Sequence, residues 1–254
     1  MDLNKLLQVS TFAGKIMLES GAETYRVEET VCKICTSFGA EQADSFVIPT
    51  GIMVSISHEN EVASLLKRVT SRGVDLNKID KINDLARKTQ IESLSIDDFN
   101  KQLIEISKGD RYSNLYTFFW SAISAGSFAV LFGGNSKDFI VATLVGLIIK
   151  IVINTCQKLN INEFFINSLC GAICAFLAII FIKLNIGSNL DKIIIGAIML
   201  LVPGLTITNA IRDTIAGDLV SGMTKALEAF LVAVSIAVGT GGILSIFINA
   251  LGGM

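Results

Sequence analysis

The sequence predicts an α-helical membrane protein with about five transmembrane helices, preceded by a cytoplasmic α+β domain. Hydrophobic residues make up 51% of the 254 positions, and the mean hydropathy is +0.60. Charge is unevenly distributed, because residues 1–112 hold 31 charged side chains and the remaining 142 residues hold only 13. Soluble domains carry about 25% charged residues. The first part therefore fits a soluble domain (1–112), and the second fits a lipid-embedded domain (113–254).

Helical periodicity marks the start of the soluble part. Apolar residues recur at helical spacing over residues 3–17 and 27–38, which predicts two amphipathic helices. Ser20 and Glu23 have the spacing of a capping box before the second helix, and Gly39 is expected to end that helix.

A small sheet and two more helices are expected next. Three β-rich runs cover residues 45–51, 52–57 and 63–69, with Pro49-Thr50-Gly51 as a turn between the first two. Helical patterns then cover about 77–90 and 96–108, and Ser95 is placed to cap the second of these. The pattern predicts a three-stranded sheet accompanied by helices.

The stretch "GAETYRVEET" packs charges densely at the start of the second predicted helix. Arg26 lies three residues from both Glu23 and Glu29, so these side chains can pair on one helix face. One interpretation is a solvated charged face. The other is a polar face that docks on the membrane part or on a partner.

Redox, metal and nucleic-acid chemistry are not expected. "CKIC" (Cys32 and Cys35) has C-x-x-C spacing, but it lies in a helical pattern and no second Cys/His pair completes a zinc site. His58 is the single histidine, beside Glu59, and a solvated role is favoured over catalysis. A net charge of −2 without a basic block argues against nucleic acid. No metal or cofactor is predicted.

Five apolar segments are each long enough to span the hydrocarbon of a bilayer. They cover about 113–132, 138–156, 164–183, 191–209 and 224–249. Because no signal peptide is apparent, the soluble part is expected in the cytoplasm, and an odd number of spans then places the C-terminus outside. The predicted location is the cell (inner) membrane, as a multi-pass protein.

Two features inside the spans allow more than one interpretation. "GTGG" at residues 239–242 either packs tightly against a neighbouring helix or forms an unwound point lining a cavity. Lys150 either extends toward the inner face or contacts substrate, and the former is favoured. Small residues such as Gly171 are expected to let helices approach closely.

A proline interrupts the fourth apolar segment. Pro203 removes a backbone donor and clashes with the preceding turn, and Gly204 loosens the chain further, so the helix should break there. In lipid, such breaks are tolerated where they line a protein-buried or wet cavity. Transporters use the resulting helix N-terminus to bind anionic substrates. Thr206, Thr208 and Asn209 follow and offer hydroxyl and amide partners.

Charged residues follow one turn later. Arg212 can bind a carboxylate in bidentate fashion, and buried carboxylates can take up protons, so Asp213, Asp218 and Glu228 are candidate proton carriers. In the alternative interpretation, residues 209–222 are an ordinary loop and Glu228 belongs to a surface pair with the lysine three residues before it. The pattern "AIRDTIAGDLVSG" favours a short amphipathic or re-entrant helix over a random linker.

Three stretches resemble the threonine/serine exporter family: "SGAETYRVEETV", "PTGIMVSI" and "VPGLTITNAIRDTIAGDLVSGMTKALEAFLVAVSIAVGTG". Members of that family have a cytoplasmic domain followed by membrane spans. Some are single chains, and others are split into a larger subunit like this chain and a small membrane subunit, as in the bacterial pair linked to succinate export. The resemblance implies a transporter subunit rather than an enzyme, exporting threonine/serine or a dicarboxylate such as succinate with proton coupling.

The resemblance also implies which residues act and which partners are needed. The functional positions it implies are Pro203, Gly204, Asn209, Arg212, Asp213, Asp218, Gly222 and Glu228. It identifies Gly21, Glu23, Thr24, Arg26 and Glu28 as a family motif in the soluble domain. The implied partners are a small carboxylate substrate, the lipid bilayer, and a second five-span membrane subunit or further copies of the chain. Two five-span units in inverted orientation would suit the odd span count.

Two rival functions remain open at this level. A membrane-tethered hydrolase could use Asp213 and Asp218, but their spacing places them on different sides of one helix, which is unsuited to a shared-proton pair. The other rival is a non-transporting accessory or sensor subunit, in which the α+β domain reads a signal.

Overall fold

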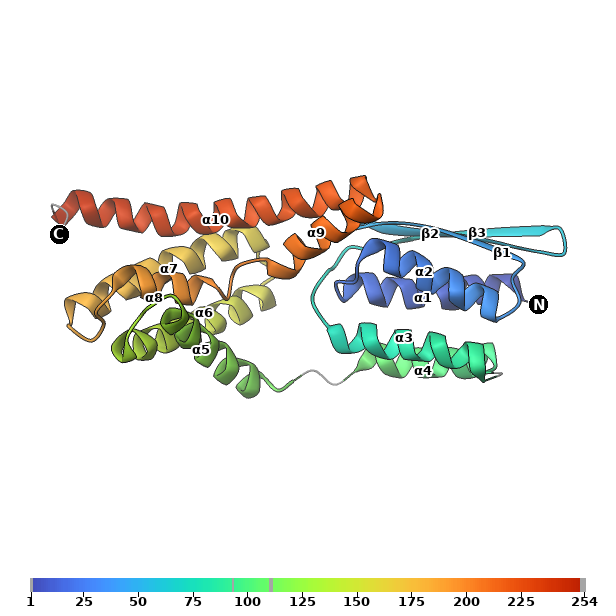
Figure 1. Ribbon diagram of the computed structural model, residues 1–254, viewed down its shortest axis with the longest axis horizontal. Coiled ribbons are helices and arrows are strands. Elements are labelled where there is room, and N and C mark those ends of the chain that lie inside the picture. The colour runs from blue at the N-terminus through green and yellow to red at the C-terminus, as the bar shows by residue number, and fades with distance from the viewer. Residues whose placement is uncertain (1, 93, 110–111, 252–254) are drawn as a thin grey trace. The chain divides into compact units, whose positions relative to one another are not determined.

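The computed structural model describes residues 2–92, 94–109 and 112–251 (Figure 1). The chain divides into two compact units. Unit 1 comprises Met1–Asp110 and Gly204–Leu227, and unit 2 comprises Arg111–Pro203 and Glu228–Met254. Residues 204–227, which follow the proline break, thus associate with the N-terminal residues.

Unit 1 contains helices and a three-stranded sheet, as the sequence predicts, and the sheet is antiparallel with α1 and α2 packed against it. Its elements are α1 (Leu3–Glu19), α2 (Thr24–Ser37), β1 (Gln42–Ile48), β2 (Gly51–His58), β3 (Glu61–Arg68), α3 (Leu76–Ile91), α4 (Ile96–Lys108), α9 (Gly204–Ala216) and the first turns of α10 (Leu219–Leu251). The strand order is β1-β2-β3, with Val47 opposite Ile52 across the first pair. Val47, Ile52, Val54 and Ile56 are buried in one core with apolar residues of α1 and α2.

Of two predicted helix caps, the structure shows one and not the other. Ser95 caps α4, since its Oγ accepts a hydrogen bond from the Asp98 N–H at 3.1 Å. The predicted capping box of Ser20 and Glu23 is wrong. Ser20 is instead the C-cap of α1, and Glu23 is the N-cap of α2 without a side-chain capping bond. Gly21, with φ of +88°, makes the reversal between the two helices, a conformation that favours glycine.

Unit 2 is helical. It contains α5 (Asn114–Leu131), α6 (Ser136–Lys158), α7 (Glu163–Lys183), α8 (Leu190–Ile198) and the rest of α10, and α6 packs against α5, α7 and α8. Within the described residues, α6, α7 and α10 are long and apolar enough to cross a membrane. The expected span over about 191–209 is not one helix, because α8 ends at Ile198 and α9 starts at Gly204. The structure therefore supports three candidate spans, and an arrangement with five is a proposal.

Some glycines of unit 2 allow close packing of helices. Of the two interpretations of "GTGG", the unwound point is wrong, because α10 stays helical through residues 239–242. A Cβ on Gly171 of α7 would lie 2.8 Å from the Ile236 carbonyl oxygen of α10, so the absence of a side chain lets these helices approach. Lys150 is half-buried on α6.

The five cysteines are free thiols. Cys35 is fully buried, and burial raises the pKa of its thiol to about 11. Cys32 is half-exposed, and its pKa is also raised, first by burial and then by the charges of Asp44 and Glu28. A high thiol pKa suppresses the reactive thiolate, so the C-x-x-C pair has a structural environment.

Candidate functional site

The polar residues after Pro203 lie on two antiparallel helices of unit 1, here termed the α9–α10 hairpin (Gly204–Leu227). Proline disfavours helix in the residue before it, and the chain is non-helical at Val202 and Pro203 before α9 begins. Gly217, with φ of +99°, ends α9, and α10 begins two residues later. A Cβ on Gly222 would lie 3.0 Å from the Ala210 carbonyl oxygen, so this glycine lets α10 lie close to α9.

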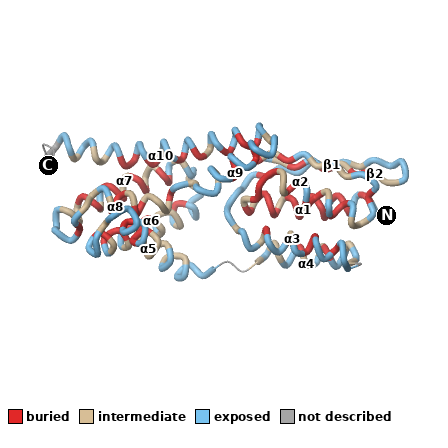
Figure 2. The backbone as a smooth tube through the Cα atoms, in the orientation of Figure 1, coloured by how far each residue is buried: buried red, intermediate tan, exposed pale blue. Residues whose placement is uncertain are grey.

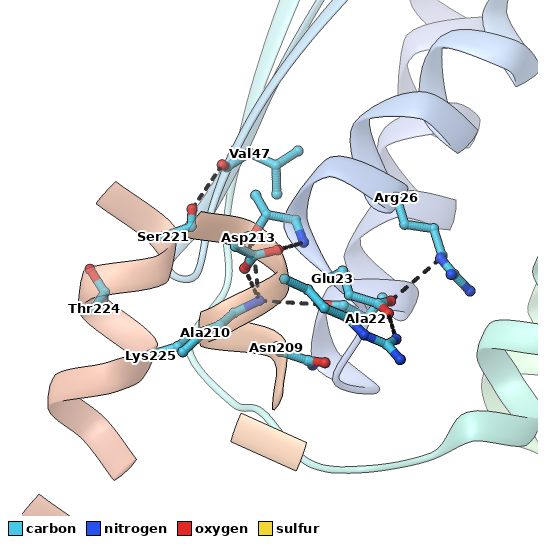
Figure 3. Close-up of polar contacts among 12 residues, drawn as sticks. Ala22, Glu23, Arg26, Val47, Asn209, Ala210, Asp213, Ser221, Thr224 and Lys225 are labelled. Atoms are coloured by element: carbon cyan, nitrogen blue, oxygen red, sulfur yellow. Dashed lines mark hydrogen bonds and ion pairs between the residues drawn. The ribbon is translucent and has the colours of Figure 1, made fainter. Parts of the chain in front are cut away.

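Asp213 of α9 caps helix α2 from a distant point in the chain. Its Oδ1 accepts a hydrogen bond from the Thr24 N–H at 3.0 Å, and its Oδ2 accepts one from the Thr24 hydroxyl at 2.9 Å (Figure 3). The first N–H groups of a helix have no partner inside the helix, and the helix dipole favours a negative charge there. Asp213 therefore supplies the cap that Ser20 and Glu23 do not.

Lys225 neutralises this carboxylate. Its Nζ lies 2.7 Å from Asp213 Oδ2 and 3.3 Å from the Thr24 hydroxyl oxygen. Both charged side chains are shielded from water, with exposed fractions of 8% for Lys225 and 0% for Asp213. The lysine is thus buried as the counter-ion of a buried carboxylate, whereas the loop interpretation places it on the surface.

A second ion pair joins the same two segments. Arg212 Nη1 donates a hydrogen bond to Glu23 Oε1, and Arg26 Nε lies 3.4 Å from Glu23 Oε2. Burial would raise the pKa of Glu23, but its backbone hydrogen bond and the two arginines outweigh this, so the pKa is lowered. Beside this pair, the Asn209 side-chain amide donates to the Gly21 carbonyl oxygen at 2.8 Å.

A second group of carboxylates lies next to Asp213. Glu28 Oε1 accepts a hydrogen bond from the Val47 N–H at 2.7 Å, and the Ser221 hydroxyl lies 3.5 Å from the Val47 carbonyl oxygen. Burial, followed by the charges of Asp218 and Asp213, raises the pKa of Glu28. Burial and the charge of Asp213 likewise raise the pKa of Asp218, against the opposing effect of Lys225, and Asp218 Oδ2 is buried without a hydrogen-bond partner among the described residues.

The remaining predicted positions are Pro203, Thr206, Thr208 and Glu228. The Thr208 hydroxyl donates to the Gly204 carbonyl oxygen of its own helix at 3.0 Å. Thr206 is half-buried on α9, while Pro203 and Glu228 belong to unit 2 and are also half-buried. Among the described residues, no group of histidine, cysteine or carboxylate side chains could hold a metal ion.

Most members of this polar group were predictable from the sequence, but their pairing was not. Glu23, Thr24, Asn209, Arg212 and Asp213 stand in two motifs that no local pattern connects. No sequence pattern assigned a site role to Lys225, Ser221 or Val47. The usable signal for the lysine was its place in an otherwise apolar segment, where a charge requires a partner. We term Gly21–Glu28 together with Asn209, Arg212, Asp213, Asp218 and Lys225 the polar cluster.

Comparison with known proteins relates the chain to transporters. The model of the ThrE family, described as "Putative threonine/serine exporter", matches residues 8–247. A protein of Klebsiella aerogenes named as a probable succinate transporter subunit is 21% identical and covers 88% of this chain and 86% of its own length. A protein of Mycobacterium tuberculosis named as a probable threonine/serine exporter is 19% identical. A protein of Corynebacterium glutamicum named as a threonine/serine exporter is 22% identical. The match covers 92% and 93% of this chain but 45% and 50% of those exporters, so the chain spans about half their length. No solved structure matches.

Apolar helices long enough to span a bilayer, together with a buried polar cluster and these relatives, define a membrane transporter rather than an enzyme. The chain belongs to the threonine/serine exporter family, whose model covers nearly its whole length.

Proposed function

We propose that this chain is a subunit of a proton-coupled exporter of small carboxylates, namely threonine and serine or a dicarboxylate such as succinate. The names of its relatives support both substrate classes. The observation that carries the proposal is that basic side chains of the polar cluster already bind carboxylates, since Arg212 pairs with Glu23 and Lys225 pairs with Asp213.

Substrate recognition is assigned to Arg212. Its side chain is 54% exposed while it contacts Glu23, so a substrate carboxylate can approach the open side of the guanidinium and compete with Glu23. Asn209 and Thr206, on the same helix, are assigned as polar partners for the rest of the substrate. Arg212 does not distinguish a hydroxy amino acid from a dicarboxylate, since both carry the group it binds.

Proton coupling is assigned to Glu28 and Asp218. The pKa of each is raised, and Lys225 is the one lysine of the cluster beside the carboxylates of Glu28, Asp213 and Asp218. A carboxyl group whose pKa is raised by burial and by like charges exchanges its proton closer to neutral pH than an ordinary one. Such a group can take up a proton on one side of the membrane and release it on the other.

The proposal includes five spans, a cytoplasmic N-terminus, an external C-terminus and a location in the inner membrane. It also includes a second five-span subunit or further copies of this chain. The word subunit in the name of the Klebsiella relative supports a partner, as does the greater length of the two exporters.

The test is transport of labelled threonine, serine and succinate into inverted vesicles of the native host, with and without a proton gradient. A hydrogen bond to a charged group contributes about 1.5–3 kcal/mol, so Arg212→Ala should raise the half-saturating concentration about ten- to a hundredfold. Asp213→Asn should reduce transport as well. Arg87→Ala, which removes an exposed pair with Asp84 on α3, is the matched control and should transport normally.

The outcomes separate the parts of the proposal. Normal transport by both site variants would refute the site. Absence of gradient-dependent transport for every substrate in vesicles of the parent would refute the transport role and favour a non-transporting accessory subunit.

A further inference from the structure

The α9–α10 hairpin buries polar side chains and exposes apolar ones, whereas a helix of a soluble domain normally does the reverse. In α9 the buried residues are Asn209, Ala210 and Asp213, and in the first turns of α10 they include Ser221 and Lys225. The side chains of Asn209, Asp213 and Lys225 point toward α2 and its preceding turn, and that of Ser221 points toward Val47 of β1 (Figure 3). A helix on the surface of a soluble protein normally buries its apolar stripe instead.

The apolar side chains of the hairpin face outward. Ile207, Ile211 and Ile215 are 43%, 56% and 81% exposed, and their four-residue spacing places them on one side of α9, away from Asn209 and Asp213. Figure 2 shows α9 largely exposed, consistent with this arrangement.

The same surface continues along α10. Val220, Met223 and Leu227 are 67%, 74% and 58% exposed, and Phe230 and Val234 extend the row on the same helix. The apolar surface that starts on the hairpin is therefore continuous with the surface of a helix that can cross a membrane. We call Ile207, Ile211, Ile215 and the exposed apolar residues of the first turns of α10 the outer apolar face.

The length of α10 indicates where its first turns lie. The apolar part of this helix, Leu219–Asn249, has 31 residues, whereas about 20 suffice to cross the hydrocarbon core. The charged residues of this stretch, Lys225 and Glu228, lie in its first turns, so we expect the excess at this end, in the layer of lipid headgroups. Because α9 is joined to these turns through the short link at Gly217, it is held at the same level.

We propose that the α9–α10 hairpin lies in the interfacial layer of the bilayer, with its outer apolar face on the lipid acyl chains and its polar face on α2. Lipid is thus the occupant of the outer apolar face. Amphipathic helices in this position bury their apolar side to a depth of about 5–10 Å. The bilayer then supports from one side the helix that presents Asn209, Arg212 and Asp213 on the other.

The experiment uses tryptophan fluorescence of the full chain in lipid vesicles. The sequence contains a single tryptophan, Trp120, so Trp120→Phe provides a silent background into which Ile211→Trp or Ile215→Trp is introduced. Ile91→Trp is the matched control, because Ile91 is an isoleucine near the end of α3 with an exposed fraction of 86%, close to that of Ile215. An unchanged unfolding temperature relative to Trp120→Phe shows that each variant is folded.

With phospholipids brominated near the headgroup end of the acyl chain, tryptophans at 211 and 215 should lose most of their emission. Their emission maximum should also lie to the blue of the control at 91, which should be quenched only by aqueous acrylamide. Red emission quenched by acrylamide would mean that the face is in water. Blue emission unaffected by brominated lipid would mean that a protein partner or a second copy covers it. Either result overturns the proposal, and neither depends on transport.

Discussion

Asp213 shows most clearly how one residue joins two distant motifs. Its carboxylate is fully shielded from water and accepts hydrogen bonds from both Thr24 and Lys225. We expect Asp213→Asn to lower the free energy of unfolding by about 3–5 kcal/mol, because the Lys225 ammonium is left buried without a counter-charge. Chemical denaturation of the purified chain in detergent, followed by circular dichroism, measures this loss.

Two controls distinguish charge burial from general damage. Adding Lys225→Met to Asp213→Asn should recover most of the lost stability, because no charge is then buried unpaired. Asp191→Asn removes an exposed carboxylate that pairs with Lys192, and it should change stability by less than about 0.5 kcal/mol. A single Asp213→Asn variant as stable as the parent would contradict the counter-ion role of this residue.

The role of a residue could be predicted from the sequence where a local pattern of neighbouring residues indicates that role. Arg212 and Asp213 follow a helix break, and Ser95 precedes an amphipathic helix, so both positions could be identified. The capping box failed because Ser20 and Glu23 are separated by Gly21, whose left-handed conformation ends one helix before the next begins. No local pattern indicates that a helix is capped by a residue 189 positions away.

At the scale of elements, close contact between α7 and α10 depends on glycine. A Cβ on Gly171 would meet the Ile236 carbonyl oxygen at 2.8 Å and the Thr240 nitrogen at 3.3 Å, and backbone atoms cannot rotate away. Gly171→Ala should therefore reduce stability by about 1–3 kcal/mol through overpacking. Gly241→Ala is the matched control, because nothing lies within 4 Å of its added Cβ. It should leave stability equal or raise it by up to about 1 kcal/mol, since alanine favours helix.

The comparison is made by thermal unfolding of both variants in the same detergent. Equal behaviour of Gly171→Ala and Gly241→Ala would show that α7 and α10 are not in the close contact described. The sequence predicted small residues at helix contacts, yet it could not separate Gly171, which packs, from Gly241, which does not. That distinction depends on which side of each helix meets its neighbour.

For the whole molecule, the pH dependence of stability follows from carboxyl groups whose pKa values are shifted in opposite directions. The pKa values of Glu28 and Asp218 are raised, so the stability from their protonated forms is full below about pH 4 and is lost as pH rises through the folded pKa. The pKa of Glu23 is lowered, so its contribution is present above about pH 4.3 and is lost as pH falls.

We expect Glu28→Gln to reduce the loss of stability on raising the pH from about 4 to 8, because glutamine does not ionise yet still accepts the Val47 hydrogen bond. The stability lost at acid pH through Glu23 should remain. Unfolding temperatures across this pH range measure both effects. Parallel curves for Glu28→Gln and the parent would show that Glu28 does not titrate differently in the folded state.

The sequence by itself determined the class of this protein, because the physical signals involved are local. Uneven charge distinguishes a charge-rich from a charge-poor part of the chain, helical periodicity identifies the helices, and Pro203-Gly204 predicts the break that the structure shows. The family motifs are likewise continuous stretches of chain.

Only the tertiary structure decided where the residues after the break belong. Residues 204–227 associate with unit 1, and their polar side chains face the turn before α2 while their isoleucines face outward. The sequence of an amphipathic helix specifies that it has two faces, but not which face meets protein. That choice depends on the partners, and here the α2 N-terminus and Glu23 provide charge-assisted hydrogen bonds that favour the polar face.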